Sequence, residues 1–229
     1  MVKFDFEQRA AESPFVESIW RTTSEDAGRF MSMAVTKWQM VISKHEDKIY
    51  FTIRGPETKA AWADSPENAE FFGINFKLGT FMPHMPNSQL VDLDINLPDA
   101  SAERIWLQGA AWEVPSFENA DTFIARLVRD ELLVHDPIVD ATLAGRAQAV
   151  SLRSVQRRFL RATGLTHGAF SQIERAQHAA TLLEQGVSIL DTVDQAGYAD
   201  QPHLTRSLKR FVGRTPAEIL RSYWSEVSK

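Results

Sequence analysis

Apolar and polar residues alternate in several short runs of the first half of the chain, as they do in strands that bury one face. Gly79 and Pro98 each end one of these runs, and a polar stretch joins two others as in a hairpin. Short strands separated by turn signals predict a mostly-β sandwich or barrel. The predicted strands are residues 15–20, 38–43, 48–53, 71–78 and 90–97.

The spacing of the apolar residues changes to the period of a helix near residue 119. The predicted helix covers residues 122–134, and Pro137 stops it. The residues that share its apolar face are Phe123, Leu127, Val128, Leu132 and Leu133.

Two helices joined by a tight turn are predicted between residues 188 and 211. Ser188 and Asp191 have the spacing of a capping box, which begins a helix. Gly197 can adopt the positive φ that a tight turn needs, because it has no Cβ atom. The apolar residues that recur at helical spacing in the second helix are Leu204, Leu208 and Phe211.

The opposite face of this second helix is polar and basic. Arg and Gln side chains can bond guanine and adenine edges through two hydrogen bonds, and Lys suits phosphates. A solvated surface helix has the same pattern, so periodicity alone does not show that this face binds DNA. The candidate base contacts are Gln201, His203, Thr205 and Arg206, and the candidate phosphate contacts are Lys209 and Arg210.

Residues 197–211 together with residues 213–218 resemble the C-terminal signature of AraC/XylS-type transcriptional regulators. The resemblance implies an all-α domain with two helix-turn-helix motifs that enter successive major grooves of DNA. Residues 169–186 are similar to the spacer helix between these motifs. Shorter stretches are similar to the cupin-like barrel of part of that family, namely 38–42, 73–79, 81–84 and Pro115.

Residues 151–164 resemble the recognition helix of the first helix-turn-helix in this family, with Ser151 as its cap. Ala149 stands where the turn usually has glycine, and the segment before it is too short for two helices. We therefore expect the first motif to be truncated or re-angled. Its buried stripe would be Leu152, Val155 and Phe159. Its candidate DNA contacts are Arg153, Gln156 and Arg157 on bases, with Arg158 and Arg161 on phosphates.

The distribution of charge fits a chain of two functions. The net charge is −5, but residues 1–135 hold 13 Lys and Arg against 21 Asp and Glu, whereas residues 136–229 hold 12 against 9. An acidic first part and a mildly basic second part suit a sensor domain joined to a DNA-binding domain. The small basic excess predicts modest, salt-dependent affinity for non-specific DNA.

Catalysis is not expected. The first half has three histidines, His45, His84 and His135, without the closely spaced pair of metal-binding cupins. No nucleophile elbow, P-loop or dinucleotide fingerprint occurs. We therefore expect no catalytic residue, no metal and no cofactor. The aromatic residues of this half could line a pocket for a small molecule, or could simply fill the core.

The chain has no cysteine, no apolar run that could span a bilayer and no signal-peptide core, so a cytoplasmic protein is expected.

We predict an α+β chain of three parts: residues 1–118, a mostly-β cupin-like effector domain; residues 119–136, a linker helix; and residues 137–225, an AraC-type DNA-binding domain with a double helix-turn-helix. The predicted function is a sequence-specific transcription factor that binds the major groove of double-stranded DNA and is modulated by a small molecule.

The resemblance makes a contact with RNA polymerase possible. It also makes a homodimer through the 122–134 helix possible, but this helix could equally pack on its own barrel. The alternative is a small-molecule-binding protein whose helical domain contacts other proteins instead of DNA. A metal-dependent cupin enzyme is a third, weaker hypothesis.

Overall fold

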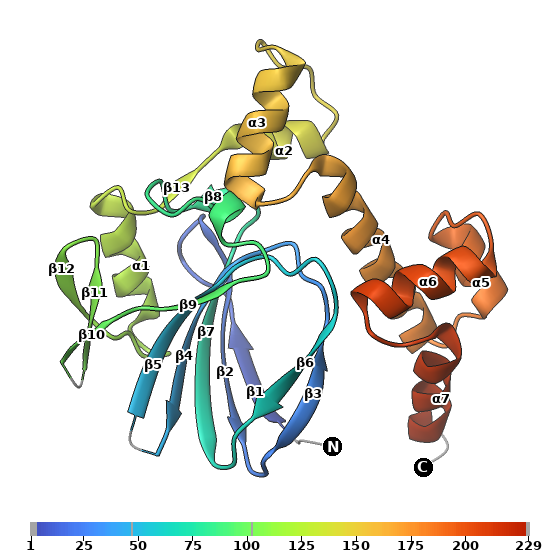
Figure 1. Cartoon of the computed structure of the whole chain (residues 1–229), viewed down its shortest axis with the longest axis horizontal. Helices are drawn as coiled ribbons and strands as arrows, with labels where there is room; N and C mark the ends of the chain where they lie inside the picture. Colours follow the sequence, from blue (N-terminus) through green and yellow to red (C-terminus); the bar gives the residue numbers. More distant parts are fainter. Residues whose placement is uncertain (1–3, 47, 102, 228–229) are drawn as a thin grey trace. The chain divides into compact units, whose positions relative to one another are not determined.

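A mostly-β region is followed along the chain by a helical region (Figure 1). The computed structural model describes residues 4–46, 48–101 and 103–227. The strands are β1 (Phe4–Arg9), β2 (Val16–Ser24), β3 (Gly28–Ser32), β4 (Gln39–His45), β5 (Lys48–Arg54), β6 (Ala61–Ser65), β7 (Ala69–Phe76), β8 (Thr80–Phe81), β9 (Asp94–Asn96), β10 (Asp99–Ser101), β11 (Arg104–Leu107), β12 (Ala110–Glu113) and β13 (Val134–His135). The helices are η1 (Asn87–Gln89), α1 (Ala120–Arg129), α2 (Pro137–Leu143), α3 (Leu152–Thr163), α4 (His167–Glu184), α5 (Ile189–Gln195), α6 (Gln201–Phe211) and α7 (Pro216–Val227).

Six strands form one antiparallel sheet in the order β1-β2-β7-β4-β5-β9. The predicted hairpin is confirmed, because Gln39 pairs with Arg54 and His45 pairs with Lys48. The predicted strands at 15–20 and 71–78 correspond to β2 and β7. Among the described pairings, β1 and β9 remain the two edges of this sheet, so these pairings do not close it into a barrel. The expected mostly-β first half and helical second half are confirmed.

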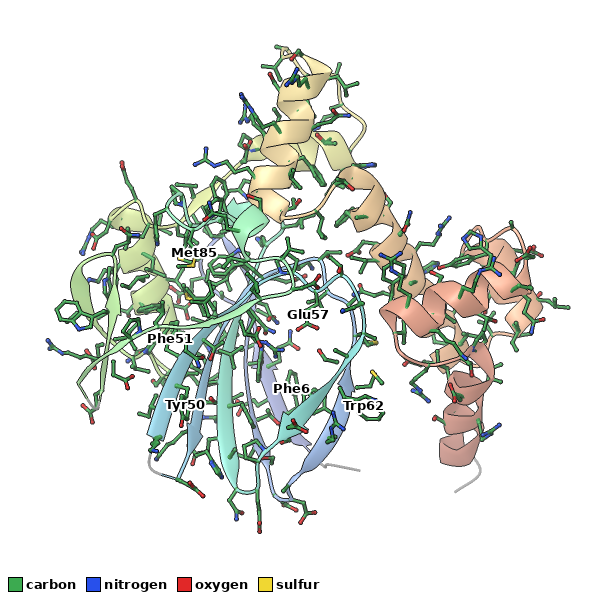
Figure 2. All side chains as sticks on the ribbon, in the orientation of Figure 1. Phe6, Tyr50, Phe51, Glu57, Trp62 and Met85 are labelled. Carbon is green, nitrogen blue, oxygen red and sulfur yellow. The ribbon has the colours of Figure 1, made fainter. Side chains whose placement is uncertain are left out.

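The core lies on one face of this sheet. Strand β5 shows the alternation that the sequence predicts, since Phe51 is 1% exposed and its neighbour Tyr50 is 43% exposed (Figure 2). Trp38 stacks on Phe76 with 3.9 Å between the ring centroids. The indole Nε1 of Trp38 donates to the carbonyl oxygen of Thr80 at 2.6 Å, so the one polar atom of this buried ring is paired.

Helix α1 packs its apolar face into this core. Phe123 and Leu127 are buried there, and the Phe123 ring meets the Trp112 ring edge-on at 5.8 Å. The predicted helix 122–134 is too long, because α1 ends at Arg129. Glu131 has φ of +55°, a left-handed conformation that ends a helix, and the chain continues into β13. The apolar face of α1 is thus buried within its own chain.

The predicted strand 90–97 is wrong over its first half. Leu90 is fully buried, but it caps η1 and forms no strand pair. Asp92 has φ of +56°, which takes the backbone out of the β conformation. Pairing begins only at β9, which lies beside β5. Alternating Leu and Asp residues therefore mimicked a strand over a segment that turns.

The described chain divides into two compact units. The first comprises residues 1–30, 37–56 and 64–166, and therefore holds α1, α2 and α3 together with most of the β region. The second comprises residues 31–36, 57–63 and 167–229, and holds α4 to α7. The predicted ranges 1–118, 119–136 and 137–225 stay a prediction, because packing units do not define functional domains.

Candidate nucleic-acid interface

Helices α5 and α6 form the predicted second helix-turn-helix, and both begin with a capped first turn. The Ser188 hydroxyl accepts from the Asp191 amide at 3.2 Å and donates to the Asp191 carboxylate at 2.6 Å. Ser188 thus caps the first turn, but the Asp191 carboxylate accepts from the Ser188 hydroxyl and not from the Ser188 amide, as it would in a complete capping box. Asp200 caps α6 by accepting from the His203 amide at 2.6 Å. The caps place the starts of both helices.

The turn between these helices has a buried tyrosine at its centre. Gly197 has φ of +69°, as the turn requires. Tyr198 follows it and is 6% exposed, with its hydroxyl 2.8 Å from the Ser207 hydroxyl on α6. The guanidinium of Arg175 on α4 lies 4.7 Å from the centroid of the Tyr198 ring. Tyr198 therefore ties the turn to α6 and to α4.

The buried and exposed faces of α6 agree with the sequence pattern. Leu204 and Leu208 are fully buried and Phe211 is 5% exposed. Gln201, Arg206, Lys209 and Arg210 are exposed, whereas His203 and Thr205 are half-buried. The His203 ring lies edge-on to Tyr198 at 5.1 Å. The structure thus brings all six predicted DNA contacts onto one helix, with His203 already engaged on one side.

Helix α3, the predicted recognition helix of the first motif, begins at its predicted cap. The Ser151 hydroxyl accepts from the Ser154 amide at 3.3 Å. Val155 and Phe159 are buried, but Leu152 is 72% exposed, so its place in the buried stripe is wrong. Helix α2 ends at Leu143 and residues 144–150 are not helical, so no preceding helix covers the first turn of α3.

Arg153, Gln156 and Arg157 are exposed on α3, whereas Arg158 bonds a carboxylate. Its Nε and Nη2 atoms lie 2.9 and 2.5 Å from the two carboxylate oxygens of Asp136. Asp136 also caps α2, accepting from the Ile138 amide at 3.0 Å. Burial alone would raise the pKa of Asp136, but the bonds from Arg158 and Ile138 lower it overall. A phosphate contact by Arg158 would have to share the guanidinium with this pair.

Sequence reasoning missed the two aspartates that cap α2 and α6. The signal was present, because Asp136 is followed by Pro137, and Asp200 precedes Pro202 by two residues. Proline is favoured in the first turn of a helix, and Asp is favoured as its cap.

The described residues contain no group of three His, Asp or Glu side chains placed to hold a metal ion. His135 Nε2 lies 2.7 Å from the Asp140 carboxylate. His84 is partly buried, and burial lowers its pKa. In the described part of the chain no helix is long and apolar enough to cross a membrane.

A groove of about 740 Å³ lies on the core face of the large sheet, within the first unit. Its floor consists of side chains that face one another across neighbouring strands, as in the pairs Arg21–Phe72 and Lys44–Glu70. Residues 113–119 form one wall. Arg21 lies between Glu7 at 2.7 Å and Glu118 at 3.0 Å. The groove has the volume of a small-molecule site, and its floor mixes charged side chains with the apolar side chains of Ile42 and Phe72.

Residues 144–222 match the helix-turn-helix domain family. A similar curated protein is the HTH-type transcriptional regulator RipA of Corynebacterium glutamicum, which is 35% identical over 89 residues. The matched stretch covers 38% of this chain and 27% of RipA, so the chain spans about a quarter of the length of the curated relative that it matches.

A solved structure of ToxT from Vibrio cholerae O395, bound to (E)-4-(8-methylnaphthalen-1-yl)but-3-enoic acid, is also similar. The TM-score is 0.40 and the identity 10%, over 97% of this chain and 99% of the ToxT chain. A TM-score of this size does not establish a common fold, and nothing about a ligand of this chain follows from it.

Proposed function

We propose that the protein is a sequence-specific DNA-binding transcription factor, because residues 144–222 of this chain are an AraC-type helix-turn-helix domain. The observation that carries this proposal is α6, which has a capped start, a buried apolar stripe and an exposed face of Gln and Arg. A helix of this kind fits the major groove, where Gln and Arg distinguish bases.

In this proposal the second motif makes most of the base contacts. Gln201, Thr205 and Arg206 contact base edges, while Lys209 and Arg210 contact phosphates. His203 takes part through the side of its ring that Tyr198 leaves uncovered. The first motif contributes Arg153, Gln156 and Arg157. Arg158, which was predicted to contact phosphate, would act mainly by holding α3 in place through its ion pair with Asp136.

The test is selection of binding sites from random DNA with the purified full chain, followed by gel shifts on the selected site. Specific binding should survive an excess of unrelated DNA and fall steeply as salt rises. If the selection enriches no sequence, the result would favour the alternative, in which the helical region contacts other proteins instead of DNA.

We also propose that the groove on the large sheet binds a small-molecule effector. Its volume, the apolar side chains of Ile42 and Phe72 on its floor, and the charge pairs of Arg21 support this use. A thermal-shift screen of metabolites on the full chain would test it, with Thr23→Trp as the control, because a large side chain on the floor should fill the groove. A compound that stabilises both proteins equally binds elsewhere.

A homodimer is proposed through the outward side of α1, where the exposed residues Ala125 and Arg129 border a shallow depression together with residues 12–15. Light scattering of the wild-type chain and of Ala125→Asp would test it, and a wild-type monomer at high concentration would exclude it. A regulator of this class would act in the cytoplasm. It could contact RNA polymerase there, and we assign no residue to that contact.

A further inference from the structure

Two segments from the β region of the sequence bond the C-terminal end of α6. These clasp segments, residues 31–36 and 57–63, belong to the same compact unit as α4 to α7. The Ala34 amide donates to the Phe211 carbonyl at 2.7 Å, and the Ala60 amide donates to the Arg210 carbonyl at 2.8 Å. The last carbonyls of a helix have no partner within the helix, so these bonds satisfy groups that would otherwise need water.

The same segments are bonded to α4. The Gln177 side-chain amide donates to the Ala34 carbonyl at 2.7 Å. The Thr36 hydroxyl donates to the Glu174 carboxylate at 2.6 Å. Ala34 is fully buried and Thr36 is 3% exposed, whereas Glu174 and Gln177 are half-buried, so these bonds are partly shielded from water. Residues 31–36 therefore join the end of α6 to the middle of α4.

The clasp segments also hold each other. The backbone groups of Val35 and Glu57 bond reciprocally at 3.1 and 2.9 Å, and the Ser32 hydroxyl donates to the Glu57 carboxylate at 3.0 Å. Trp62, later in the second segment, is 58% exposed (Figure 2). Just beyond α6, Gly213 has φ of +79°, and a Cβ atom there would lie 2.5 Å from Met31 Sδ. Met31 of the first segment therefore lies close against the turn that follows α6.

We propose that the clasp segments are a structural part of the second helix-turn-helix and set the angle of α6 against α4. The inference rests on the proposed DNA-binding function. The bonds reach backbone carbonyls at the end of α6 and polar atoms of α4, and they leave Gln201, Arg206 and Lys209 exposed. The contact therefore positions the recognition helix and does not mask it. Thr36 and Gln177 are its positioning residues.

The position of α6 controls sequence-specific binding more strongly than non-specific binding. A recognition helix must present its side chains to base edges within a fraction of an ångström, whereas phosphate attraction tolerates displacement. A segment of the β region that fixes α6 can therefore change sequence-specific affinity without touching DNA. It does so with little effect on non-specific affinity.

The experiment uses the full chain with Thr36→Val and Gln177→Ala, singly and together. The matched control is Thr181→Val on the same helix, because the exposed Thr181 hydroxyl donates to the Gln177 carbonyl one turn earlier and forms no bond to the clasp segments among the described residues. Affinities are measured for a site selected from random DNA and for unrelated DNA of equal length. Footprints on the selected site are compared in parallel.

Each clasp variant should weaken binding to the selected site about fivefold, the factor for one net hydrogen bond, and the control should not. Binding to unrelated DNA should stay unchanged, and protection should be lost at the part of the site that Arg206→Ala also affects. Unchanged specific affinity in the double variant, an equal loss on both DNAs, or tighter binding would overturn the inference. A wild-type chain that selects no sequence would instead overturn the proposed function.

Discussion

Arg158 of α3 and Asp136, the cap of α2, form an ion pair with two hydrogen bonds, of 2.9 and 2.5 Å. The Asp136 side chain is 12% exposed and that of Arg158 is 43% exposed. The pair thus ties the start of one helix to the middle of the next. It fixes α3 against α2, where the connecting residues 144–150 form no helix.

Asp136→Asn should lower the free energy of unfolding at neutral pH by about 1–2 kcal/mol, since the bonds lose their charge and one side is exposed to solvent. The pKa of Asp136 is lowered in the folded chain, so its contribution is complete above the pKa of an unfolded Asp and disappears as the pH falls through the folded pKa. Urea unfolding at neutral pH and near pH 3, roughly below the ordinary Asp value, would measure this. Equal differences at both pH values would show that the charge of Asp136 is not the cause.

Arg206→Ala should weaken binding to a selected DNA site by about 1–3 kcal/mol if Arg206 bonds a guanine through two hydrogen bonds. Its effect on unrelated DNA should be much smaller. Fluorescence anisotropy with labelled duplexes would measure both affinities. Arg221→Ala, which removes an exposed arginine of α7, is the control for lost charge. Similar losses in the two variants would remove Arg206 from the base contacts.

Lys209→Ala should weaken binding to all DNA to a similar extent. One phosphate contact contributes about 0.9 to the slope of log affinity against log salt, so the slope should become shallower by that amount. Affinity measured over a series of salt concentrations gives this slope directly. An unchanged slope would place Lys209 away from the phosphates.

Gly164→Ala and Gly197→Ala should differ in stability although both glycines have positive φ, of +77° and +69°. A Cβ atom at Gly164 would lie 2.7 Å from the Asn87 carbonyl oxygen, whereas nothing lies within 4 Å of one at Gly197. We expect a loss of about 1 kcal/mol at Gly197 from backbone strain and about 1–3 kcal/mol more at Gly164 from overpacking. Thermal unfolding of both variants would check this. Equal losses of stability would mean that the backbone at Asn87 shifts to accommodate the added methyl group.

Local signals were enough to predict the second helix-turn-helix. The Ser188–Asp191 cap, the glycine at 197 and the apolar spacing of α6 each act over a few residues, and each is present in the structure. The hairpin of β4 and β5 was predicted for the same reason, because alternation and a polar turn are properties of neighbouring residues.

Predictions failed where conformation depends on distant residues. The run 90–97 alternates like a strand, but burial of Leu90 against the core and the turn at Asp92 override that pattern. Leu152 has the spacing of a buried residue, yet no helix precedes α3 closely enough to cover it.

The sequence by itself determined the position of helix α6, its exposed Gln, Arg and Lys side chains, and the mostly-β first half, since caps, turns and periodicity are encoded within a few residues. Only the tertiary structure decided that Arg158 pairs with Asp136 and that Ala34 and Ala60 bond the end of α6. Backbone amides carry no sequence signal for their partners. Their bonds are set when segments far apart in the chain are brought together by the burial of apolar side chains.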